Sequence, residues 1–134
     1  MFGMASGKIK NNLQKAFSIC FDPLKDELGN VPVEMQESKV ITASLLGVCE
    51  SYAAAHGIRK HRSVAIITDA VFEEVFRRES TLVQTRVDHW LLENDAEFMQ
   101  ALQHARNQTS KSLDLDWLRT YALNHFEPAN NLML

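Results

Sequence analysis

The chain has 134 residues, of which 46% are hydrophobic and 23% charged, with a net charge of −3 and a pI of about 5.9. This length fits one domain, and the hydrophobic content excludes an intrinsically disordered protein. The weakly acidic balance argues against a nucleic-acid-binding protein, which is usually basic. No apolar run approaches the roughly 18 residues of a membrane span, so no membrane association is expected.

The distribution of glycine and proline predicts the fold class. Neither residue occurs from Ile58 to Glu127, a stretch of 70 residues. Hairpins and parallel strands need turns rich in these residues, whereas helices joined by polar caps do not. We therefore predict an all-α protein, a single-domain bundle of five or six helices. The domain spans residues 1–134, with 1–7 and 129–134 as candidate disordered tails.

The N-terminus and the two cysteines bear on location. The N-terminal lysines are not followed by the apolar core of about 7–15 residues that a secretory signal needs. Cys20 and Cys49 fall on apolar helical faces. Free, buried thiols in a reducing cytoplasm are the favoured interpretation, and a disulfide or a thiol switch is the alternative.

In chain order, the first predicted helix begins at Met4 or Lys8 and ends at Phe21. Asp22-Pro23 combines a capping residue with proline at a first helical position, and starts a short turn that ends at Gly29. Residues 30–33 form an extended connector, because the residue before a proline is pushed out of helical geometry.

The second predicted helix, Glu34–His56, is expected at the centre of the bundle. It carries an apolar stripe at helical spacing: Ile41, Leu45, Val48, Cys49 and Tyr52. Beside the stripe runs a row of four small residues at i, i+4 spacing, here called the small-residue ridge: Ala43, Gly47, Ser51 and Ala55. Such a ridge lets another backbone approach closely, from the same chain or from a second subunit. The four residues are therefore interface candidates, and Gly57 is expected to end the helix.

The third predicted helix starts near Ser63 as a cap. Its buried stripe is Val64, Ile67, Val71, Phe72, Val75 and Phe76. Glu73–Arg77 and Glu74–Arg78 are expected to pair on its outer side. The stripe continues through Val83, Val87 and Trp90, and a break or kink is favoured at Ser80-Thr81, although an unbroken helix to Glu93 remains open.

Two further helices follow. Asn94 with Glu97 predicts the start of a helix through Asn107, with Phe98, Ala101, Leu102 and Ala105 facing inward. The segment 108–111 is a polar linker. Ser112 or Asp114 caps the last helix, which Pro128 ends and which turns Leu115, Leu118, Ala122 and Phe126 inward.

Motifs for chemistry are missing from the sequence. It contains no Glu-x-x-His pair, no His-Glu-x-x-His and no Cys-x-x-Cys, so no metal is expected. It also contains no Gly-x-Ser-x-Gly and no glycine-rich phosphate loop. We therefore predict no catalytic residue and no cofactor.

An aromatic row is the first candidate binding feature. Trp117, Tyr121 and His125 follow one another at i, i+4 spacing on the last predicted helix. The row either packs beneath the first helix or the tail, or forms a protein-binding or dimer patch, since Trp and Tyr are favoured interface anchors. A pocket for haem or another flat ligand, with His125 as ligand, is the third alternative.

A basic cluster is the second candidate. Arg59, Lys60, His61 and Arg62 directly precede Ser63. A solvated, positively charged loop is the favoured interpretation. Cations beside the free N–H groups of a helix start can also complete an anion or nucleotide site, and a nucleic-acid contact is the third alternative. A DNA-binding helix-turn-helix is rejected, because the helix would open Ser-Val-Ala-Ile-Ile-Thr, which offers too few base-reading donors.

These features together predict a non-catalytic protein–protein interaction or regulatory module, cytoplasmic and homodimeric. The expected partner is a second copy of the chain or another protein. The alternative is a bundle that binds a small molecule or an anion near Trp117, Tyr121 and His125, or at the basic cluster.

Overall fold

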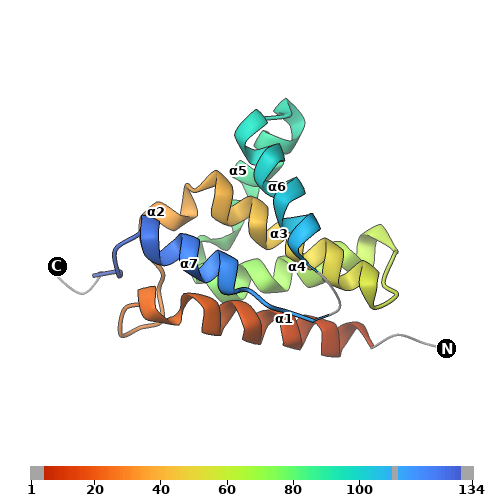
Figure 1. Cartoon of the computed structure of the whole chain (residues 1–134), viewed down its shortest axis with the longest axis horizontal. Helices are drawn as coiled ribbons and strands as arrows, with labels where there is room; N and C mark the ends of the chain where they lie inside the picture. Colours follow the sequence, from red (N-terminus) through yellow and green to blue (C-terminus); the bar gives the residue numbers. More distant parts are fainter. Residues whose placement is uncertain (1–4, 110–111, 131–134) are drawn as a thin grey trace.

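The computed structural model describes residues 5–109 and 112–130, and this part of the chain is all-α without any strand (Figure 1). The α-helices are α1 Ser6–Phe21, α2 Val33–Gln36, α3 Lys39–Ala55, α4 His61–Phe76, α5 Ser80–Glu93, α6 Ala96–Gln108 and α7 Asp116–His125. Two 3₁₀ turns, η1 Asp22–Leu24 and η2 Arg77–Glu79, join them at corners. The prediction of an all-α bundle is confirmed. No described helix is both long and apolar enough to cross a membrane.

Helix α3 is the centre of the bundle and contacts every other described α-helix, most extensively α6. Figure 1 shows α1 and α7 side by side along one edge, α4 behind α3, and α5 and α6 at the opposite end. All five residues of the predicted α3 stripe are buried, because the helix has neighbours on nearly every side.

The start of the central helix differs from the prediction. The expected helix Glu34–His56 is interrupted after the single turn α2, and α3 begins at Lys39. Ser38 has extended backbone angles, and its Oγ accepts a hydrogen bond of 3.0 Å from the N–H of Ile41. A serine that bonds its own backbone in this way favours a helix start over a helix interior.

The end of α3 matches the prediction. Gly57 takes a φ of 89°, which suits glycine. The N–H of Ile58 donates to the carbonyl of Ala53 at 2.9 Å, and that of Gly57 to Ala54 at 3.1 Å. This is the Schellman arrangement, which satisfies the last carbonyls of the helix.

The helix is interrupted between α4 and α5, as favoured from the sequence, but the interruption is at Arg77 rather than at Ser80-Thr81. Arg77 has φ 57° and ψ −127°, and α4 ends before it. Ser80 does not cap α5; its Oγ accepts a hydrogen bond from Gln84 Nε2 at 3.0 Å. Because Arg77 leaves the helix, neither of the ion pairs expected for Glu73 and Glu74 forms.

Three predicted caps are corrected. Helix α4 begins at His61, so Ser63 lies within its first turn. Asn94 takes a left-handed conformation that ends α5, and Asp95 caps α6 by accepting from the N–H of Phe98 at 3.0 Å. Neither Ser112 nor Asp114 is the N-cap residue of α7, although Asp114 Oδ1 accepts from the N–H of Asp116 at 3.0 Å.

The described parts of the predicted tails belong to the fold. Ser6 and Gly7 lie in α1, and the N–H of Ala129 donates to the carbonyl of Leu24 at 2.9 Å. The rest of both predicted tails, the possible helix start at Met4, and positions 110–111 of the predicted linker lie outside the described residues.

Candidate functional site

The small-residue ridge seats α6 of the same chain. A Cβ placed on Gly47 would lie 2.8 Å from Ala105 Cβ and 2.9 Å from the carbonyl oxygen of Leu102. Ser51 Oγ donates to the carbonyl of Arg106 at 3.3 Å. Ala43 is fully buried and Ala55 half-buried. Of the two interpretations left open, the structure shows packing within the chain, and α6 occupies the place at Gly47 that a second subunit would need.

Two ion pairs hold α3 and α6 together near their ends. Lys39 Nζ lies 2.7 Å from Asp95 Oδ2, and Arg106 Nη2 lies 2.7 Å from Glu50 Oε1. The hydrogen bond from Lys39, followed by that from the N–H of Phe98, lowers the pKa of Asp95. The same contact with Asp95 raises the pKa of Lys39. These pairs fix the relative placement of the two helices that form the candidate site.

The candidate site is a hollow of about 410 Å³ between α3, α6 and α7, here called the α3–α6–α7 hollow. It is lined by Val40, Ser44, Glu97, Gln100, Ala101, His104, Trp117 and Tyr121. Trp117 and Tyr121 are half-buried and form its aromatic wall, while Glu97, Gln100 and His104 are exposed at its rim. An apolar floor with a polar rim is the usual arrangement of a binding surface.

Trp117 has an unusual environment within this wall. Its ring meets that of His104 edge to face, with centroids 5.3 Å apart. Its indole Nε1 is buried and has no hydrogen-bond partner among the described residues. A buried donor without an acceptor costs about 1–3 kcal/mol, and such a group calls for an explanation.

His125 does not share the hollow with the other two residues of the aromatic row. Its ring stacks on Tyr121 with centroids 3.9 Å apart, and Nδ1 lies 2.8 Å from the carbonyl oxygen of Tyr121. The side chain is exposed and lines a separate hollow of about 450 Å³ with Pro32, Val33, Glu34 and residues 126–130. The row predicted from sequence is present, but its members face two hollows rather than one ligand pocket.

The basic cluster lies on the surface at the start of α4. Arg59, Lys60 and Arg62 are exposed, and Ser63 is half-buried in the first turn. Neither of the hollows described above is lined by any of these four residues. His61, the remaining member of the basic cluster, lines a separate hollow of about 240 Å³ between α3, α4 and α5.

Groups suited to metal binding or nucleophilic chemistry do not gather in the described residues. No group of three or more His, Cys, Asp or Glu side chains there could hold a metal ion. Cys20 and Cys49 are free and buried. Burial raises the pKa of Cys20 to about 12 and also raises that of Cys49, so both are thiols at neutral pH.

Comparison of the chain with protein-family models, curated proteins and solved structures finds no significant match. The function must therefore be inferred from the site itself. Of the lining residues, Trp117 and Tyr121 are predicted as site residues from the sequence, whereas Val40, Ser44, Gln100 and His104 are not. Their only sequence signal is helical phase, which does not reveal which helices meet.

Proposed function

We propose that the protein is a non-catalytic interaction or regulatory module that self-associates through the α3–α6–α7 hollow. The observation that carries the proposal is the hollow itself, about 410 Å³ in size and walled by the half-buried Trp117 and Tyr121. In a symmetric dimer the same patch of both copies meets, so the two aromatic pairs would cover one another.

Three properties of the hollow support this proposal. Its volume suits one or two large apolar side chains. Trp and Tyr are the residue types that most often anchor protein contacts. The indole N–H of Trp117 has no acceptor among the described residues, and a partner that reorients this side chain can supply one.

The test is the molecular mass in solution, measured by native mass spectrometry and sedimentation at two concentrations. Ala101 lines the hollow, and Ala101→Lys fills it with a charged side chain. Gln103 is exposed on α6 and does not line the hollow, so Gln103→Lys adds the same charge to the same helix outside it. We expect the unchanged protein and Gln103→Lys to form dimers, and Ala101→Lys to remain monomeric.

Two outcomes would overturn the proposal. If the unchanged protein stays monomeric at both concentrations, self-association is excluded. An additional small mass that is lost on denaturation favours instead the alternative function, a bundle that binds a small molecule.

We also propose that the protein is located in the cytoplasm. It is supported by the two buried, unpaired cysteines, because disulfides form and persist in oxidising compartments. Cell fractionation followed by thiol counting under denaturing conditions tests it. Recovery in an oxidising compartment would contradict it.

A further inference from the structure

Another hollow, distinct from those described above, lies where the α4–α5 corner meets the loop leading into α2. Its volume is about 330 Å³, and we call it the corner groove. It is lined by Leu28, Asn30, Val31, Val33, Gln36, Phe76, Arg77, Arg78 and Glu79. Apolar side chains and two adjacent arginines therefore line the same groove.

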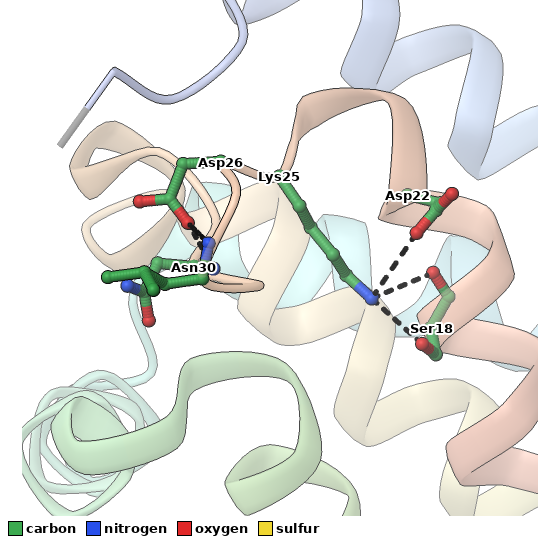
Figure 2. A network of polar contacts seen from close by, with 6 residues as sticks. Ser18, Asp22, Lys25, Asp26 and Asn30 are labelled. Carbon is green, nitrogen blue, oxygen red and sulfur yellow. Dashed lines mark hydrogen bonds and ion pairs between the residues drawn. The ribbon is translucent and has the colours of Figure 1, made fainter. Parts of the chain in front are cut away.

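One wall of the corner groove is a loop held by its own hydrogen bonds. Figure 2 shows Asp26 facing the backbone of Asn30, and Asp26 Oδ1 accepts from the N–H groups of Leu28 and Asn30, each at 2.9 Å. At the base of the loop, Lys25 Nζ donates to the carbonyl of Ser18 at 3.1 Å and to Ser18 Oγ at 2.8 Å (Figure 2). The wall is thus preformed.

This wall presents apolar side chains to solvent. Leu28 is 67% exposed and Val33 53% exposed, although both are large hydrophobic residues. Phe76, which ends α4, is buried at the groove. Leu28 and Val33 therefore offer an apolar strip beside the arginines.

The opposite wall is built on a strained residue. Arg77 has φ 57° and ψ −127°, the angles of the first central residue of a type II′ turn, where glycine is normally found. Its Nη2 lies 2.8 Å from the place that a Cβ on Gly29 would occupy, so the guanidinium lies directly over the loop. Strained conformations of this kind cluster at ligand clamps and active sites.

The two arginines have no counter-charge of their own. Neither Arg77 nor Arg78 makes an ion pair or a side-chain hydrogen bond with any described residue. Glu37 lies 4.0 Å from Arg86 instead. Glu79 is the one carboxylate among the lining residues, so the lining carries an excess of one positive charge.

We propose that the corner groove binds an acidic peptide segment of a partner protein. A carboxylate of the peptide contacts Arg77 and Arg78, because guanidinium groups match carboxylates in geometry as well as in charge. A neighbouring apolar side chain of the peptide packs on Leu28 and Val33. The proposal adds a second binding surface and does not depend on self-association.

Fluorescence anisotropy with a labelled short peptide of alternating glutamate and leucine tests the proposal, with a glutamine–leucine peptide as the uncharged control. We expect the acidic peptide to bind the full chain at least about tenfold more tightly than the control peptide. Arg77→Gly and Arg78→Gln should each weaken that binding by about tenfold.

Three further variants make the experiment decisive. Arg62→Gln removes a cation from the exposed first turn of α4 and should leave peptide binding unchanged, as should Gln103→Lys on α6, which lines neither hollow. Leu28→Asp should weaken binding of the acidic peptide by removing the apolar contact and adding a like charge. Arg77→Gly should bind less while melting at a higher temperature, which separates lost binding from lost folding.

Three results would overturn the proposal. Equal binding of the two peptides excludes recognition of the carboxylate. Equal weakening by Arg62→Gln and Arg78→Gln shows that attraction to the whole surface, rather than the groove, holds the peptide. Unchanged binding in Arg77→Gly removes the strained residue from the site.

Discussion

At the scale of single residues, two helical glycines have opposite surroundings. Gly47 faces the backbone of α6, whereas a Cβ on Gly7 in α1 would meet nothing within 4 Å. Replacing a helical glycine by alanine contributes up to about 1 kcal/mol of helix propensity. At Gly7 this gain should appear. At Gly47 the contact with the Leu102 carbonyl should outweigh it, with overpacking costs of about 1–3 kcal/mol and more for leucine.

Urea denaturation followed by circular dichroism compares these variants. We expect Gly7→Ala to be more stable than the unchanged protein, and Gly47→Ala and Gly47→Leu to be progressively less stable. A Gly47→Leu protein with unchanged stability would contradict the packing of the small-residue ridge against α6.

Arg77 supports a second prediction at this scale. A non-glycine residue at its backbone angles costs on the order of 1–3 kcal/mol, and glycine relieves this cost while adding chain entropy to the unfolded state. We expect Arg77→Gly to stabilise the fold by about 1 kcal/mol, measured by the urea midpoint. Arg78→Gly, two residues past the end of α4, is the matched control and should not stabilise. Equal gains in both variants would assign the effect to lost positive charge instead.

At the scale of elements, the sequence predicted helices more reliably than helix ends. Periodic apolar residues located every long helix, because burial of one face decides the structure of many residues together. The position of a helix end depends on single side chains, and neighbouring side chains compete to cap the same helix. Ser38 and Asp95 cap, whereas Asn94, one residue before Asp95, takes the left-handed conformation that asparagine tolerates. Both Asn94 and Asp95 are good capping residues in sequence, so nothing in their identity decides between them.

The candidate site was less predictable than the helices. Trp117 and Tyr121 were recognised as a row, but their hollow also needs Val40 and Ser44 from α3 and Gln100 from α6. Which helices meet depends on tertiary packing, which single-helix periodicity does not encode. The strain at Arg77 was likewise invisible, because the sequence around it is compatible with a continuous helix.

The ion pair between α3 and α6 makes stability depend on pH. The hydrogen bond from Lys39 lowers the pKa of Asp95, so the ionised carboxylate of Asp95 is more stable in the folded state than in the unfolded chain. This stabilisation is present above the unfolded pKa of about 3.9 and is lost as the pH falls through the lowered pKa of the folded state. Asp95→Asn keeps a capping side chain but removes the charge.

Denaturation at several pH values tests this pair. We expect Asp95→Asn and Lys39→Gln to be less stable than the unchanged protein at pH 7, with the difference shrinking as the pH falls below about 4. Asp88→Asn is the control, since Asp88 is exposed and makes no ion pair with a described residue. A difference for Asp95→Asn that is the same at all pH values would point to altered capping instead.

At the scale of the whole molecule, the close approach at Gly47 joins two helices of the same chain, α3 and α6. The small-residue ridge is covered by α6, and the two surfaces that we propose for partners lie at separate places. The α3–α6–α7 hollow and the corner groove share no lining residue, so one partner at each is sterically reasonable. Variants in one surface should therefore leave binding at the other unchanged.

The exposure of the two cysteine thiols can distinguish local opening of the bundle from global unfolding. Cys49 lies in α3, which contacts every other described α-helix, so exposing it requires dismantling the core. Cys20 lies on α1, and its Sγ is 3.9 Å from the carbonyl oxygen of Leu115, directly before α7. Moving α7 away exposes Cys20 while leaving α3 packed against α4 and α6. A local opening of this kind needs less free energy than global unfolding.

Thiol labelling of the single-cysteine variants Cys20→Ala and Cys49→Ala measures the two openings. Both native thiols should react slowly, because burial hides them and raises their pKa. As urea is added, Cys49 should react only with the loss of circular dichroism, whereas Cys20 should react at lower urea. Labelling of Cys49 as early as Cys20 would show that α3 is not the last element to open, and would contradict its central place in the fold.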